Sequence, residues 1–245
     1  MFVKKLYRSV RAEDAALFTL SFLWICVIIQ CVFLSGRDTR SVSAQAAGSP
    51  PVLILDPGHG GADGAVAPDG TAESALNLSV ALRVRDLCAF LGVDTVMTRD
   101  TEEIIYPSEA KTIVAMKKWD TRRRVEIAES VDSPVFLSIH QNIYPSSGPH
   151  GSQVLYAQNE PSRALAELIQ SRLTAALLPE NRRVPVPAGK DIYIMSHVQC
   201  TAVLVECGFL SHPQELSLLQ SADYQKKIAS VLTACYLQFT EKGVL

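Results

Sequence analysis

The chain has 245 residues, of which 48% are hydrophobic and 20% are charged, and its net charge is −2. Six of the 23 Lys and Arg residues and three of the 25 Asp and Glu residues precede residue 51, so residues 51–245 carry a net charge of −5. A mildly acidic domain without clustered basic side chains argues against nucleic acid as a partner, because phosphates are neutralised by clustered Lys and Arg.

The N-terminal region predicts a membrane segment. Residues 15–34 read AALFTLSFLWICVIIQCVFL, contain no charge, and match the roughly 20 residues that span a bilayer. Basic side chains gather in residues 1–14, so the positive-inside rule places this end in the cytoplasm and the remainder outside. We expect an uncleaved signal anchor, while small residues at 42–46 leave cleavage and secretion open as the alternative.

The segment that follows, residues 35–50, is rich in Ser, Ala and Gly and is typical of a linker. Residues 51–245 are expected to form one catalytic domain, in which apolar runs alternate with helical patterns. This alternation predicts an α/β fold with a twisted, mostly parallel sheet of about six strands flanked by helices. The strand-like runs are 52–55, 94–97, 135–139, 153–156, 191–194 and 202–205, and the clearest helical patterns are one ending at Gly92, 162–178 and 223–240.

Less regular sequence separates the second and third strand-like runs. Residues 101–121 show no clear apolar stripe and predict a partly helical loop of the kind that is often functional. The basic run at 122–124 is interpreted as a solvated helix start.

Two predicted strands end on a histidine. His59 follows the first strand in LDPGHGGADG, and His140 ends the strand VFLSIH. Ligands of open α/β sheets bind at the carboxyl ends of the strands. The glycine-rich turn around His59 is a weak match to a phosphate-binding loop, because the GxGxxG order is absent. We therefore interpret both histidines as metal ligands.

Two glutamates complete the candidate site. Glu73 stands where the loop DGTAE enters a predicted helix, and a carboxylate there would ordinarily complement the helix dipole. Its closeness in the chain to His59 favours it as the third ligand, and two histidines with one glutamate form the ligand set of catalytic zinc sites. Glu206 ends the apolar strand VLVE, where an unpaired carboxylate has a raised pKa and suits a general base. The remaining histidines of the domain, His150, His197 and His212, are interpreted as lying outside the metal site.

These motifs resemble a known family. LDPGHGGADGA, the Glu of TAESALNLSVALRVRDL, VFLSIHQN and VLVECGFLSHPQE occur in the order and approximate spacing of the zinc-dependent N-acetylmuramoyl-L-alanine amidases of amidase type 3. The resemblance covers the chain from Pro51 onward and is greatest to the germination-specific branch that acts in spore cortex. It implies one Zn²⁺ held by His59, Glu73 and His140, with Glu206 assisting catalysis.

The reaction implied by the resemblance is hydrolysis of the amide between N-acetylmuramic acid and L-alanine in peptidoglycan. Peptidoglycan is then the substrate, and the cell wall or spore envelope is the location. An activating protein partner is left open. Two other functions also stay open: a zinc peptidase or deacetylase acting on peptidoglycan, and an inactive cell-wall-binding adaptor.

Overall fold

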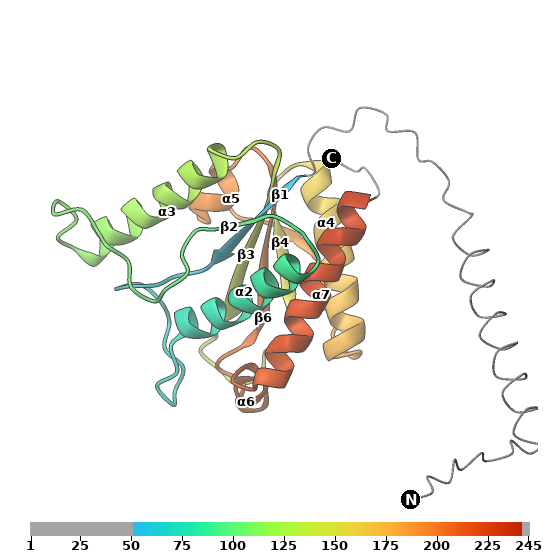
Figure 1. Ribbon diagram of the computed structural model, residues 1–245. Helices are drawn as coiled ribbons and strands as arrows, with labels where there is room; N and C mark the ends of the chain where they lie inside the picture. The colour runs from blue at the N-terminus through green and yellow to red at the C-terminus, as the bar shows by residue number, and fades with distance from the viewer. Residues whose placement is uncertain (1–50, 242–245) are drawn as a thin grey trace, which may run out of the picture. The chain divides into compact units, whose positions relative to one another are not determined.

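The apolar run after Pro51 forms strand β1 (Val52–Pro57). The structure is a computed structural model and describes residues 51–241 (Figure 1). Residues 53–55 of β1 are fully buried because helices cover both faces of the sheet. The other elements are α2 (Glu73–Phe90), β2 (Thr95–Met97), α3 (Ile113–Glu129), β3 (Pro134–Asn142), β4 (Gln153–Tyr156), α4 (Glu160–Leu177), β5 (Val186–Pro187), α5 (Tyr193–His197), β6 (Thr201–Phe209), α6 (Pro213–Leu219) and α7 (Ala222–Glu241).

The six strands form one sheet in the order β2-β1-β3-β6-β4-β5. Strands β2, β1, β3 and β6 are parallel, β4 runs antiparallel to β6, and β5 is parallel to β4. The predicted α/β fold with a mostly parallel sheet is therefore confirmed. The chain moves from β1 to β2 on one side and then to β3 on the other, which creates a switch point where ligands of such sheets bind.

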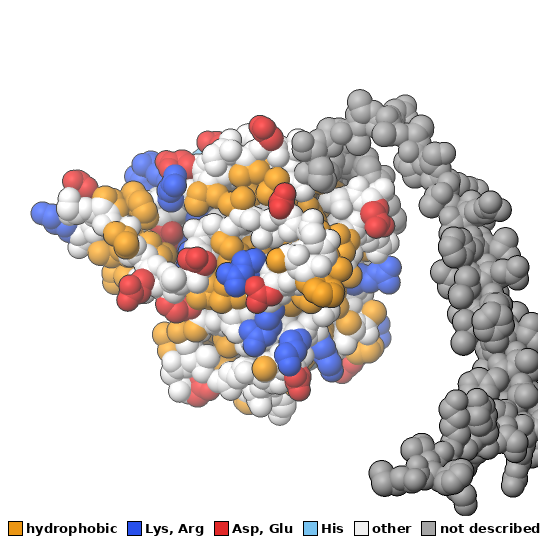
Figure 2. All heavy atoms as spheres, viewed as in Figure 1, with side chains coloured by type: hydrophobic (Ala, Val, Ile, Leu, Met, Phe, Trp, Pro, Cys, Tyr) orange, Lys and Arg blue, Asp and Glu red, His pale blue; other side chains and the backbone are white. Residues whose placement is uncertain are grey.

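Helices form a layer on each face of the sheet. Helices α2, α4 and α7 cover one face, with a core that includes Leu55, Val84, Ile169 and Leu232. Helices α3 and α5 pack on the opposite face, where Phe136 is fully buried. On the outer surface in Figure 2, acidic and basic side chains are interspersed among apolar ones.

The predicted strand at 191–194 is wrong. Tyr193 begins the short helix α5, and the edge strand is instead β5. A short apolar run does not distinguish a strand from a buried helical turn by its period alone. The prediction of a partly helical loop at residues 101–121 is confirmed, because a loop reaches Thr112 and α3 begins at Ile113. The Thr112 side chain caps α3 by accepting a hydrogen bond from the Ala115 amide.

The interpretation of residues 122–124 as a solvated helix start is also wrong for Arg124. These residues lie in the second half of α3, and the Arg124 side chain is only 3% exposed. It is buried because its guanidinium pairs with Asp56 at 2.6 Å and with Asp120 at 2.8 Å. A charge run does not reveal which of its members has buried partners.

Among residues 51–241, no helix combines the length and apolar character needed to cross a bilayer. The predicted membrane segment at 15–34 and the linker at 35–50 lie outside the described residues, so those predictions remain untested.

Candidate metal centre

His59 lies in a tight turn immediately after β1. Its φ is +59°, in the left-handed region that costs a residue with a side chain ~1–2 kcal/mol. The preceding Gly58 is required for close packing, since a Cβ there would lie 2.1 Å from Nε2 of His140. The turn therefore brings the two histidines together, with their ring centroids 4.9 Å apart.

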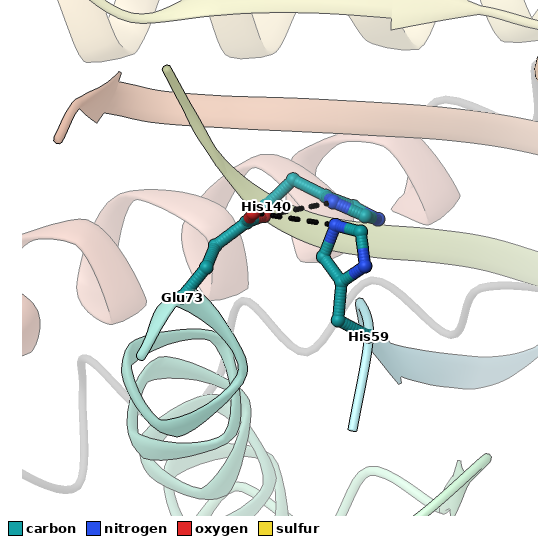
Figure 3. Close-up of side chains that lie close together, drawn as sticks. All are labelled: His59, Glu73 and His140. Atoms are coloured by element: carbon teal, nitrogen blue, oxygen red, sulfur yellow. Dashed lines mark hydrogen bonds and ion pairs between the residues drawn. The ribbon is translucent and has the colours of Figure 1, made fainter. Parts of the chain in front are cut away.

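The side chains of His59, Glu73 and His140 converge from the turn after β1, from α2 and from β3 (Figure 3). Nε2 of His59 lies 3.2 Å from Oε2 of Glu73, and Nδ1 of His140 lies 3.1 Å from Oε1 of the same carboxylate. One ligand atom from each residue falls within 4.8 Å of the others, so the three could hold a metal ion. Glu73 is the first residue of α2, as its place in the sequence predicted.

The carboxylate of Glu73 is held ionised although its side chain is only 3% exposed. Burial raises its pKa, but hydrogen bonds and charge interactions with His140 and His59 outweigh burial and lower the pKa. The side-chain amide of Asn77 and the backbone N–H of Gln141 also donate to Oε1, at 3.2 and 3.1 Å. An ionised carboxylate fixed by several donors is oriented as a metal ligand needs to be.

Asp63 is a site residue that the sequence reasoning missed. Its Oδ2 lies 2.8 Å from Nδ1 of His59, and Lys117 contacts its other oxygen at 3.1 Å. Burial lowers the pKa of His59, but Asp63 and Glu73 raise it to about 9, while the hydrogen bond with His59 lowers the pKa of Asp63 to about 2. A carboxylate four residues beyond a candidate ligand was the available signal, since metal-binding histidines donate their other N–H to such groups.

Glu206 lies beside this cluster on the neighbouring strand. It pairs in register with His140 across β3 and β6, at the same edge of the sheet. Burial raises the pKa of Glu206 to about 7, and its Oε2 has no hydrogen-bond partner within the described part of the chain. A carboxyl group with a pKa near neutrality can accept and return a proton.

A cavity of about 620 Å³ opens over these groups on the α3 and α5 side of the sheet. His59, His140 and Glu206 line it together with Lys117 from α3 and Tyr193 from α5. It is large enough to admit a substrate group to both the metal cluster and the free carboxyl group.

The other histidines of the domain lie apart from the metal cluster. His150 is exposed and its Nδ1 lies 2.9 Å from the Gly148 carbonyl, His197 ends α5 stacked on Tyr193, and His212 caps α6. Within residues 51–241 the only cluster able to hold a metal ion is that of His59, Glu73 and His140.

Comparison of the chain with known proteins identifies its family. A family profile described as N-acetylmuramoyl-L-alanine amidase (Amidase_3) matches residues 53–235. The chain belongs to this family. The matched region contains the three clustered residues, Asp63 and Glu206, and the expectation of an amidase enzyme is confirmed at the level of the family.

Individual amidases are similar over most of the chain. The germination-specific N-acetylmuramoyl-L-alanine amidase of Bacillus subtilis (strain 168) is 34% identical over 231 residues, which cover 92% of this chain and 94% of that protein. The amidase LytC of the same organism is 31% identical, but the alignment covers 74% of this chain and only 34% of LytC.

A solved structure of the CwlD amidase from Clostridioides difficile, in complex with the GerS lipoprotein, is 32% identical. It superimposes with a TM-score of 0.75 over 78% of this chain and 99% of that one. The amidase AmiC2 of Nostoc punctiforme is 27% identical, with a TM-score of 0.67.

Proposed function

We propose that the chain hydrolyses the amide bond between N-acetylmuramic acid and L-alanine in peptidoglycan, and that it acts in spore cortex maturation or germination. The family membership and the similarity to a germination-specific amidase support this substrate. The observation that carries the proposal is that Glu206 lines the same cavity as His59 and His140, which form a cluster with the buried Glu73.

The donor atoms of the cluster fit Zn²⁺. Two imidazole nitrogens and one carboxylate oxygen are the protein ligands of many catalytic zinc sites, and they leave a further coordination position open. Bound zinc supplies Lewis acidity, which polarises a carbonyl group and acidifies a water molecule. Because the pKa of His59 is raised to about 9, its imidazole must release a proton when it becomes a ligand.

Glu206 performs the proton transfers in this proposal. Its carboxylate accepts a proton from the water that attacks the lactyl carbonyl carbon. The same proton is then donated to the L-alanine nitrogen as the C–N bond breaks, so the products are a free lactyl carboxylate and a stem peptide with a free amine. Asp63 orients His59 by accepting the hydrogen bond from Nδ1, which leaves Nε2 facing Glu73.

Digestion of purified peptidoglycan, followed by mass spectrometry, tests this function. We expect muramic acid residues that have lost their peptides, together with stem peptides that begin with free L-alanine. Cleavage within the stem peptide would identify a peptidase, and release of acetate would identify a deacetylase. Retention of the substrate without turnover by the zinc-loaded protein would identify a binding adaptor.

The domain organisation proposed for the chain is a cytoplasmic N-terminus at 1–14, a membrane anchor at 15–34, a linker at 35–50 and the catalytic domain at 51–245. This arrangement would hold the enzyme at the outer surface of the membrane, facing peptidoglycan. Fractionation of cells followed by protease treatment of intact protoplasts tests it, because an anchored external domain stays with the membrane and is degraded.

A lipoprotein partner is also proposed, since the similar CwlD amidase was solved in complex with one. Co-purification of proteins bound to the full-length chain tests this.

A further inference from the structure

Three consecutive main-chain carbonyls of the turn that carries His59 face two buried arginines, Arg99 and Arg124. Nε of Arg99 donates to the carbonyls of Pro57 at 2.9 Å and His59 at 2.7 Å, and its Nη2 donates to that of Gly58 at 3.0 Å. Arg124 donates to the carbonyls of Pro57 and His59 at 2.8 and 2.7 Å. The turn is therefore held by hydrogen bonds from two charged side chains.

Arg99 also links this turn to the helix that carries the second ligand. Its Nη2 donates to the carbonyl of Ser74 at 2.9 Å, in the first turn of α2 and next to Glu73. One guanidinium nitrogen thus bonds both to the residue before His59 and to the residue after Glu73. The planar guanidinium offers several donors in a fixed geometry, which sets the spacing of the groups that it bridges.

Within the described residues, the guanidinium of Arg99 has few other hydrogen-bond or ion-pair partners. Its remaining donor, Nη1, bonds to the Thr101 carbonyl at 2.9 Å, and its acidic partner Glu102 lies 3.8 Å away and is half exposed. Arg124, in contrast, forms close ion pairs with Asp56 and Asp120. Arg99 is therefore directed mainly at main-chain oxygens around the cluster, whereas Arg124 also stabilises buried charge.

We infer that Arg99 is a positioning residue for the metal centre, assisted by Arg124. By bonding the carbonyls on both sides of Gly58, it holds His59 in its left-handed conformation and fixes the imidazole relative to Glu73. The inference rests on the proposed role of His59 and Glu73 as metal ligands. Arg99 therefore affects metal affinity through His59 and Glu73, and it touches neither the metal nor the substrate itself.

The test measures metal binding by the full-length chain and its Arg99→Ala variant. Zn²⁺ affinity is determined by competition with a chromophoric chelator, and the Co²⁺-loaded proteins are compared by visible absorption. We expect Arg99→Ala to bind Zn²⁺ at least about 10-fold more weakly and to give an altered Co²⁺ spectrum. Millimolar guanidinium should restore part of the affinity, because it can occupy the space left by the side chain.

Leu232→Ala is the matched control, since Leu232 is fully buried in α7 and lies outside the metal cluster. It loses stability through a core cavity but should keep wild-type Zn²⁺ affinity and spectrum. Wild-type affinity in Arg99→Ala, or a loss no greater than in Leu232→Ala, would overturn the inference. If Arg99→Ala does not fold, Arg99→Lys replaces it, because one ammonium group cannot bridge both segments and the same loss is expected.

The variant His59→Ala separates this inference from the proposed function. If the wild-type chain binds no Zn²⁺, or if His59→Ala binds it as tightly as wild type, the ligand assignment itself fails. If His59→Ala loses Zn²⁺ while Arg99→Ala retains it fully, the ligand assignment stands and only the role of Arg99 is rejected.

Discussion

The α-carbon of Gly58 faces the imidazole of His140 so closely that a methyl group on it would lie 2.1 Å from Nε2. Gly58→Ala should therefore displace the His140 ring and weaken Zn²⁺ binding by at least about 10-fold, because a ligand moved from its position loses coordination. Metal content after dialysis against a weak chelator measures the effect. Gly148→Ala is the control, since no atom lies within 4 Å of its added methyl group. Equal zinc content in the two variants would contradict this prediction.

Glu206→Gln should retain zinc and lose turnover. The amide has the size of the carboxyl group but cannot accept a proton, so the rate should fall by about 10²–10⁴. Release of stem-peptide amine gives the rate, and metal analysis of the same sample gives the zinc content. A variant that loses both would show that Glu206 holds the metal, and the roles of the four site residues would need reassignment.

Asp63→Asn should lower the pKa of His59 in the metal-free protein from about 9 toward the ordinary value of an imidazole, 6.5. The imidazolium is the form that the Asp63 carboxylate stabilises, so removing the charge favours loss of the proton. A pH titration of the ring by NMR measures this change. The exposed Asp86 supplies the control variant Asp86→Asn, which should leave the His59 titration unchanged.

The same Asp63→Asn variant should bind Zn²⁺ about 10-fold more weakly when measured above pH 9, since the ring is no longer oriented by a carboxylate. Below pH 9 the wild-type chain must also release a proton from His59, which reduces its advantage. The ratio of wild-type to variant Zn²⁺ affinity should thus be smaller at pH 7 than at pH 9.5. A ratio that increases as the pH falls would refute this account of Asp63.

Asp56→Asn should destabilise the domain at pH 7, by at most about 3–5 kcal/mol, because it removes one of the two carboxylates that pair with the buried Arg124 and leaves only Asp120. Burial raises the pKa of Asp56, but Arg124 and hydrogen bonds from Ser138 and Thr98 lower it below 3.8. The stabilisation is complete above pH 3.8 and is lost as the pH falls through the folded-state pKa. Urea unfolding of both proteins from pH 7 down into the acid range should show the difference shrinking; a constant difference would contradict the prediction.

The positions of His59, His140 and Glu206 could be predicted because each follows or ends an apolar run. Strands that run parallel share one edge for their carboxyl ends, so the sequence implied that these groups lie near one another. Helix α2 was predicted from its apolar stripe and its end near Gly92, whose φ is +73°. These features depend on local pattern and on rules of sheet topology.

Other features could not be predicted because they depend on contacts between distant residues. Arg99 is 40 residues from His59, and Arg124 is 65 residues away, so no local period shows that both bond to the His59 carbonyl. The same holds for the burial of Asp56, whose partners come from three other segments. Helix α5 was misread because its apolar residues are too few to establish a helical period.

The pairing of His140 with Glu206 makes their relative placement a property of the backbone. Adjacent strands keep a nearly constant separation of about 4.8 Å, so neither loop length nor side-chain packing alters the distance between these two α-carbons. A slip of β6 by one residue would turn Glu206 to the opposite face and carry the buried leucine and valine side chains with it. A sequence change that preserves the core of this sheet therefore also preserves the spacing between the His140 and Glu206 backbones.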